Sequence, residues 1–338
     1  MTTNTHGAEA WLMKKRTYTV RFVTPAFLGN ANQDGQWRTP PFKHLLREWW
    51  RVAWAGKNDP ADWRRMREVE GYLFGHAWLE NDRDGHGKKV SARKSRVLLR
   101  LSSWNRGGCN SLPALAKVAS DRNSVSSDLY LGYGPVAKAG RLKNNVAVGE
   151  GENATLSLAY PGDDEVDQQI LLTLALINRF GTVGGRSRNG WGSVCFEPDE
   201  GQLPLLDEEA HSRDWHECLQ QEWPHAIGWD DRGLLLWQSD ELNSWTKAME
   251  LLGTIRKQVN ALDVDRLLLN QPVGRKGKRI PSSLRFKVIP AGEGRLRATV
   301  FHMPCTPPDL RNTRKLEQTW RKVHAFLDDQ RVLRRSRP

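Results

Sequence analysis

Hydrophobic and polar residues alternate in several short stretches of the first half of the chain. This period-two pattern predicts β-strands at residues 17–24, 97–102, 155–160 and 191–196. Between these stretches, apolar residues recur at helical spacing and predict helices at residues 39–55, 62–78 and 166–180. Residues 107–152 are irregular and rich in Ser, Asn and Gly, which is typical of an insertion. Without the insertions, the order is β-α-β-β-α-β, the ferredoxin-like arrangement.

The second half of the chain repeats this order. Alternation predicts strands at residues 233–238, 284–289 and 295–301, and helical spacing predicts helices at residues 243–262 and 312–327. Acidic residues and prolines cluster in residues 198–214, where we expect the boundary between the two halves. We therefore predict an α+β protein with two ferredoxin-like domains, the first with large insertions. The expected parts are a flexible N-terminus (1–13), a first domain (14–200) and a second domain (201–338) with a basic tail at residues 331–337.

Composition points to a polyanionic partner. The 338-residue chain has a formal net charge of +12, which favours association with nucleic acid. No apolar run is long enough to cross a membrane, and the first ten residues are polar, so we expect a cytoplasmic protein without a membrane partner. The four cysteines are far apart, and His211, His216 and Cys218 lack a zinc-ligand spacing, so we expect no metal and no cofactor.

Residues 178–193 form a glycine-dense segment with three arginines and no acidic residue. A P-loop would end in Gly-Lys-Ser/Thr, and a dinucleotide-binding loop would have a strand before it and a helix after it; neither pattern is present. Exposed backbone amides together with arginines can bind a phosphate backbone. The candidate residues of this segment are Arg179, Gly181, Gly184, Gly185, Arg186, Ser187 and Arg188. The alternative is an ordinary glycine-rich turn with solvated arginines.

The helix at residues 39–55 has two faces. Phe42, Leu45, Leu46, Trp49 and Ala53 form an apolar stripe that is expected to face the sheet. The adjacent face combines cationic and aromatic side chains, namely Lys43, Arg47, Trp50, Arg51 and Trp54. Such a face can hold phosphates and stack bases, although the tryptophans could equally pack and the cations be solvated. We expect the three cations to be replaceable by alanine without unfolding the chain.

Several motifs in the first half of the chain resemble those of a known family. Residues 24–29 (TPAFLG), 38–51 (RTPPFKHLLREWWR) and 68–75 (EVEGYLFG), followed by the glycine-rich segment, resemble the RAMP superfamily of CRISPR effector proteins. The block Lys-x-x-x-Arg-x-Trp-Trp-Arg is similar to the first RAMP subunit of the type III-B Cmr complex. The resemblance covers residues 17–194, and the second half resembles the family only in its predicted element order.

The resemblance implies a non-catalytic, RNA-binding subunit of a CRISPR ribonucleoprotein. Its partners would be the CRISPR guide RNA, whose 3′ part it would hold, the complementary target RNA, and other RAMP subunits. It also implies that Arg186 and Arg188 lie at the RNA. Some RAMP relatives cleave the guide precursor with a histidine, so the alternative is an endoribonuclease that uses His44, which stands where the family usually has a small residue. A third possibility is a stand-alone RNA-binding module.

Further basic segments could extend the RNA footprint. Blocks of like charge are usually solvated arms, and some of them become ordered on RNA. We favour ordering on RNA for residues 88–96 and 275–279, and leave the tail at residues 331–337 open. The candidate RNA contacts outside the glycine-rich segment are therefore Arg38, Lys43, Arg47, Trp50, Arg51, Lys88, Lys89, Arg93, Arg275, Lys276, Lys278 and Arg279.

Overall fold

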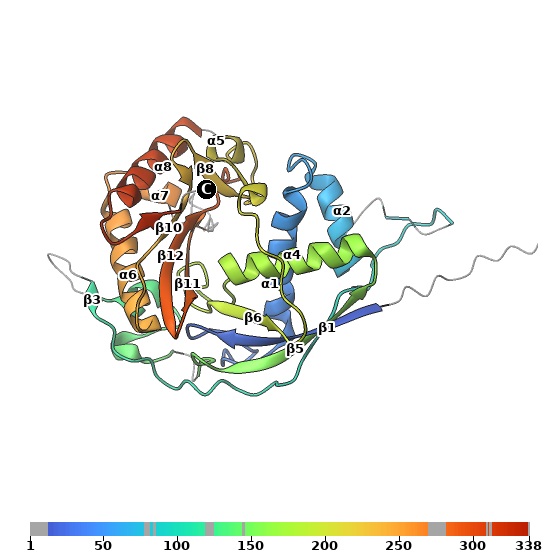
Figure 1. The fold of residues 1–338 in the computed structure, drawn as a ribbon, viewed down its shortest axis with the longest axis horizontal. Coiled ribbons are helices and arrows are strands. Elements are labelled where there is room, and N and C mark those ends of the chain that lie inside the picture. The colour runs from blue at the N-terminus through green and yellow to red at the C-terminus, as the bar shows by residue number, and fades with distance from the viewer. Residues whose placement is uncertain are drawn as a thin grey trace, which may run out of the picture.

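The computed structural model describes residues 13–77, 82–83, 86–118, 125–143, 146–269, 282–308, 310 and 313–336. Within these residues, the chain forms two four-stranded sheets, each with helices packed on it (Figure 1). All strand pairs of both sheets are antiparallel.

The first sheet has the ferredoxin-like strand order β2-β5-β1-β6. Its elements are β1 (Met13–Phe22), α1 (Thr39–Ala55), β2 (Leu98–Leu101), β5 (Asn153–Pro161), α4 (Asp164–Phe180) and β6 (Val194–Pro198). Val20 of β1 pairs with Ala154 of β5 on one side and with Phe196 of β6 on the other. All three side chains are buried, which explains the alternation seen in the sequence.

The second sheet repeats this order as β11-β12-β10-β13. Its elements are β10 (Leu236–Gln238), α6 (Trp245–Ala261), β11 (Leu284–Gly292), β12 (Arg295–His302), α8 (Thr313–Asp328) and β13 (Arg334–Arg335). The predicted fold class is thereby confirmed. β13 lies in the basic tail whose role the sequence left open, and the Arg335 side chain forms ion pairs with Asp230 and Asp328.

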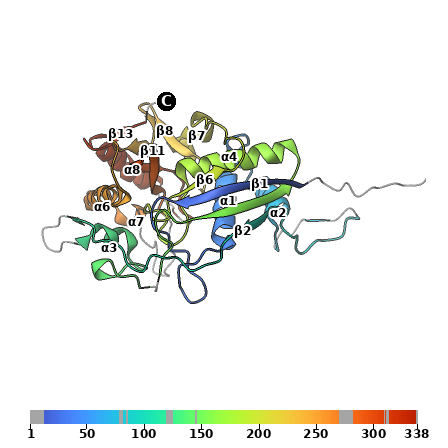
Figure 2. The same cartoon turned by 60° about the horizontal axis from the view of Figure 1, so that its bottom comes forward.

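Shorter elements fill the connections. α2 (Trp63–Phe74) follows α1, and the segment predicted as an irregular insertion holds β3 (Lys117–Val118), β4 (Val125–Ser126), α3 (Ser127–Gly132) and a 3₁₀ turn, η1 (Lys138–Gly140). Between the two domains lie η2 (Glu209–His211), β7 (Ser212–Asp214), α5 (Trp215–Cys218), β8 (Ile227–Asp230) and β9 (Gly233–Leu234), and α7 (Arg266–Leu269) follows α6. The insertion reaches the second domain, because α3 packs beside α6 (Figure 2). Among the described helices, none combines the length and apolar character needed to cross a membrane.

The helices begin and end where capping residues occur, and these positions differ from some of the predicted boundaries. Asp163 caps α4, because its side chain accepts hydrogen bonds from the amides of Glu165 and Val166. α2 ends at Phe74, earlier than predicted, because Gly75 adopts a φ of 82° and its amide bonds back to Gly71. The N-cap of α1 is Arg38, whose side chain makes no capping hydrogen bond.

The outward face of the first sheet is polar. Thr17, Thr19, Arg21 and Ser157 point away from the buried face and are at least partly exposed. Within the described strands of this sheet, no aromatic residue occupies an outward position. Many ferredoxin-like RNA-binding domains stack bases on aromatic residues of the open sheet face. This sheet therefore lacks that platform, and any base stacking must take place elsewhere.

The two domains are joined through buried polar contacts from β11. Lys287 is fully buried, and its Nζ donates hydrogen bonds to the carbonyls of Ile177, Asn178 and Val194 at 2.6, 2.8 and 3.1 Å. The first two carbonyls lie in the last turn of α4, where helix carbonyls run short of backbone partners, and that of Ile177 also accepts from the Gly181 amide. Burial lowers the pKa of Lys287 to about 7, while these carbonyls favour its charged form. Neighbouring β11 residues hold the glycine-rich segment: the Phe286 amide bonds to the Arg188 carbonyl, and the Val288 amide bonds to Ser193 Oγ, each at 2.9 Å.

Candidate nucleic-acid interface

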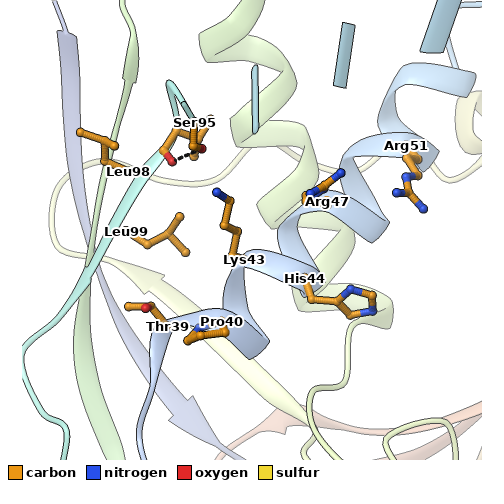
Figure 3. Close-up of a pocket in the computed structure, with 10 residues that line it drawn as sticks. Thr39, Pro40, Lys43, His44, Arg47, Arg51, Ser95, Leu98 and Leu99 are labelled. Atoms are coloured by element: carbon orange, nitrogen blue, oxygen red, sulfur yellow. Dashed lines mark hydrogen bonds between the residues drawn. The ribbon is translucent and has the colours of Figure 1, made fainter. Parts of the chain in front are cut away.

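The cations predicted on α1 line one pocket. Lys43, Arg47 and Arg51 face a cavity of about 460 Å³ between α1 and the edge strand β2. Figure 3 shows the Lys43 side chain extending from α1 toward Ser95 on the strand side of this pocket. Burial and the nearby Arg47 charge lower the pKa of the Lys43 ammonium. The pocket is therefore a partly desolvated cationic site at the edge of the sheet, where an anion would be strongly attracted.

The two arginines of this pocket are held by one buried carboxylate, which sequence analysis missed. Glu70 of α2 is 1% exposed. Its carboxylate accepts hydrogen bonds from Arg47 Nε at 2.7 Å and from Arg51 Nε and Nη2 at 3.1 and 2.8 Å. A signal was present in the sequence, since Glu70 falls on the apolar stripe of α2 with Met66 and Leu73. The ion pairs fix the direction of both guanidinium groups. Arg47, Arg51 and Glu70 together keep a net positive charge.

Trp50 does not belong to this surface. Its side chain is fully buried, and its indole N–H donates a hydrogen bond to Gln169 on α4. Its ring packs edge-on against Phe74 of α2. The prediction that Trp50 contacts RNA is therefore wrong for this conformation, because α1 is covered by α2 and α4 as well as by the sheet. Arg38 is placed beside the loop before α1, where its Nη1 donates to the Gly29 carbonyl.

The glycines of residues 178–193 allow close packing of backbone on backbone. Gly184 has a φ of 98°, and a Cβ there would lie 2.8 Å from the carbonyl oxygen of Phe27. The Gly185 amide donates to that same Phe27 oxygen, and the Gly181 amide donates to Ile177. These two amides are therefore not presented to a phosphate as expected. These glycines instead allow the segment to pack closely on the backbone of Phe27 and Ile177.

The three arginines of this segment point in different directions. Arg179 forms an ion pair with Glu208 at 2.5 Å. Arg188 is partly buried and its Nη1 donates to the Ser282 carbonyl at 3.4 Å; burial and the charge of Arg285 lower its pKa to about 10. Of the three, only Arg186 is exposed; it adopts a φ of 56°. Ser187 beside it is partly exposed.

The insertion brings an aromatic residue next to Arg186. A Cβ at Gly134 would lie 3.4 Å from Arg186 Nη2, so the Arg186 side chain lies against this part of the insertion. The neighbouring Tyr133 is 67% exposed, and Lys143 Nζ lies 5.5 Å from its ring centre. Arg186, Tyr133 and Lys143 thus form a second exposed cationic and aromatic group. Sequence analysis missed Tyr133 and Lys143, because nothing in an irregular segment signals which side chains reach the glycine-rich segment.

The other basic candidates have different fates. Lys88 and Lys89 are exposed. Arg93 is engaged by Asp82, to which its Nε and Nη2 donate at 2.5 and 2.7 Å; Arg93 and His76 lower the pKa of that carboxyl to about 2. Arg275, Lys276, Lys278 and Arg279 lie outside the described residues.

His44 lies on the exposed side of α1. It borders the same pocket, but Figure 3 shows its ring directed to the other side of the helix from Lys43. No described side chain forms a hydrogen bond with the His44 ring, so nothing in the described part of the chain fixes its tautomer. Among these residues, no three His, Cys, Asp or Glu side chains gather in a way that could hold a metal ion.

Comparison with known proteins identifies the family. A sequence model of the RAMP superfamily matches residues 19–195, more than half of the chain. The chain belongs to the RAMP superfamily. The match to this RAMP protein runs from the end of β1 to the start of β6 and includes α1, α2 and the whole glycine-rich segment. A search among curated proteins finds no match.

A search of solved structures finds similar chains, one of which shares this fold along almost its whole length. The chain is similar to a structure of the type III-B Cmr-beta complex bound to cognate target RNA, with 11% identity, a TM-score of 0.50, and coverage of 92% of this chain and 99% of that chain. It is also similar to Cmr1 from Pyrococcus furiosus in its apo form, with 14% identity, a TM-score of 0.47, and coverage of 93% and 97%. At these identities the likeness is one of fold.

Proposed function

We propose that this RAMP protein is a non-catalytic, RNA-binding subunit of a cytoplasmic type III-B CRISPR ribonucleoprotein. In that role it holds the 3′ part of the guide RNA and helps to capture complementary target RNA beside other RAMP subunits. The observation that carries the proposal is the pocket in which Lys43, Arg47 and Arg51 meet at the edge of a RAMP sheet. The net charge of +12 and the exposed group around Arg186 support it. A solved structure of the same fold comes from a complex bound to target RNA.

The Lys43→Ala variant tests the RNA contact. If Lys43 neutralises one phosphate, the log–log slope of single-stranded RNA affinity against salt should become shallower by about 0.7. The measurement is fluorescence anisotropy with a labelled RNA over a series of salt concentrations. Lys322→Ala is the matched control, because Lys322 is an exposed lysine on α8 of the other domain. A Lys43→Ala protein with the wild-type slope would remove this pocket from the RNA site.

Membership of the ribonucleoprotein has its own test. Tagged wild-type protein, purified from its native host, should bring down other RAMP subunits together with RNA that contains CRISPR spacer sequences. Sequencing that RNA identifies the guide. Protein that binds RNA but purifies without other RAMP subunits would support the stand-alone RNA-binding module instead.

We expect His44→Ala to leave target cleavage by the assembled complex unchanged. A general acid or base contributes about 10²- to 10⁴-fold, so the loss of a real one would be obvious in a time course at saturating target RNA. His44 has no described hydrogen-bonding partner to orient it. A rate loss of a hundredfold or more with assembly intact would instead favour the endoribonuclease, as would cutting of repeat RNA by the purified protein in a chelator.

A further inference from the structure

A second pocket adjoins the cationic one. It has a volume of about 550 Å³ and lies between the first turns of α2 and the segment of residues 220–223. Arg51 lines both pockets, so the cationic surface of α1 leads directly into this one. Trp63 on α2 and Trp223 on the opposite segment both contribute to its lining. Neither tryptophan is among the candidate RNA contacts described above.

Trp63 is exposed in a strongly basic setting. Its side chain is 42% exposed at the start of α2. Arg64 Cζ and Arg67 Cζ lie 5.3 and 5.9 Å from its ring centre, close enough for cation–π contact. Aromatic rings and guanidinium planes are both surfaces on which unpaired bases stack. Glu70, which is bonded to Arg47 and Arg51, and Glu222 also line the pocket, so its aromatic rings rather than a net charge offer the binding surface.

The opposite wall is held in place and offers hydrogen-bonding groups. The indole N–H of Trp223 donates to the Pro60 carbonyl at 3.3 Å. The Thr306 amide donates to the Gln221 carbonyl at 2.8 Å, which anchors the segment from the second domain. The side chains of Gln220 and Gln221 line the pocket, and amides both donate and accept, as base edges require.

We propose that this pocket, formed by Trp63, Trp223, Arg67 and Gln221, receives one unpaired base of single-stranded RNA. Arg51 connects it to the phosphate-binding surface of α1, so the RNA backbone continues from the base into the cationic pocket. The proposal rests on the proposed RNA-binding function and adds a base-stacking site to a protein whose open sheet face has none among its described residues.

The experiment combines a substitution with an RNA lacking a base. Trp63→Ala should weaken binding of single-stranded RNA about tenfold, within the range measured for loss of one base–aromatic stack. It should leave the slope of affinity against salt unchanged, because stacking releases no counterions. Trp63→Phe should retain most of the affinity. Trp104→Ala is the matched control, since Trp104 is 56% exposed elsewhere on the molecule. An RNA carrying an abasic site at the stacked position should bind wild type and Trp63→Ala equally.

Crosslinking locates the base directly. RNA with a single 5-iodouridine, irradiated on the wild-type protein, should label the peptide that contains Trp63 or Trp223. Wild-type affinity in Trp63→Ala, with crosslinks only elsewhere, would overturn the base pocket while salt-dependent RNA binding, and with it the proposed function, still stood. Failure of the wild-type protein to bind RNA would overturn both. Unchanged RNA affinity with loss of co-purifying subunits would assign the pocket to a protein partner and also overturn it.

Discussion

Replacing both Arg47 and Arg51 by alanine should lower the free energy of unfolding by about 3 kcal/mol. The two arginines are the ion-pair partners of Glu70, whose carboxylate is 1% exposed. Removing the partners of a buried charge costs about 3–5 kcal/mol. The lower end applies here, because the Arg51 side chain is 39% exposed and its loss lets water approach. Urea unfolding followed by circular dichroism measures the change.

The control for this result is a third substitution. Glu70→Gln in the double-alanine background removes the buried charge and should recover most of the lost stability. The single variant Arg47→Ala leaves Arg51 bonded to both carboxylate oxygens and should lose much less. Wild-type stability of the double variant would show that water alone satisfies Glu70. The expectation that all three cations of α1 can be removed without unfolding is thus replaced, and Lys43 is the position to use in RNA-binding tests.

Acid should destabilise the second domain well above the pH at which carboxylates titrate. His302 Nδ1 and His324 Nε2 are 2.9 Å apart in the core between β12 and α8. Burial lowers the pKa of His324 from 6.5 to about 3, and burial lowers that of His302 in the same direction. Below pH 6.5 the unfolded chain therefore binds protons that the folded chain does not, and the free energy of unfolding falls as the pH falls. His324 alone contributes about 1.4 kcal/mol per pH unit, or nearly 3 kcal/mol by about pH 4.5.

This effect is measured from urea unfolding between about pH 7 and pH 4.5. His324→Phe, which keeps an aromatic ring beside Trp215 and Trp320, should make the dependence on pH shallower. His44→Asn alters an exposed histidine and should leave it unchanged. Burial also lowers the pKa values of His211 and His225, so these residues act in the same direction as His324. Burial would raise the pKa of the Asp167 carboxyl, but its hydrogen bonds to Arg16, Lys14 and Tyr160 lower it to about 2, so folded Asp167 does not titrate between these pH values. A variant with the wild-type pH dependence would exclude His324 as a source of the acid sensitivity.

The elements of the fold could be predicted because their patterns are local. Val20 and Phe196 face the same core from paired strands, and each already lies in an alternating stretch of sequence. β13 could not be predicted, because two adjacent arginines carry no periodicity; it forms because Leu236–Gln238 offers an edge that it can pair with. A strand so short is specified by its partner rather than by its own sequence.

Only the part of the candidate site that lies on a single helix, α1, could be predicted from the sequence. Helical spacing placed Lys43, Arg47 and Arg51 together, and they do line one pocket. The same spacing placed Trp50 on their face and missed that α2 and α4 cover that side of α1. The direction of a side chain in a loop depends on distant residues. Arg188, for example, is close to the charges of Glu48 on α1 and Arg285 on β11, which spacing along the glycine-rich segment cannot reveal.

The contacts of β11 have a consequence for dissecting this protein. Lys287 completes the end of α4, and Phe286 and Val288 hold the glycine-rich segment from behind. A fragment that stopped near residue 200 would lose the Lys287 hydrogen bonds at the end of α4. It would also lose the β11 amides that bond to the glycine-rich segment. Chimeras that exchange second halves between relatives should work only when this segment and β11 come from the same parent. The two halves are therefore best regarded as one inherited unit, because β11 of the second half shapes the glycine-rich segment of the first.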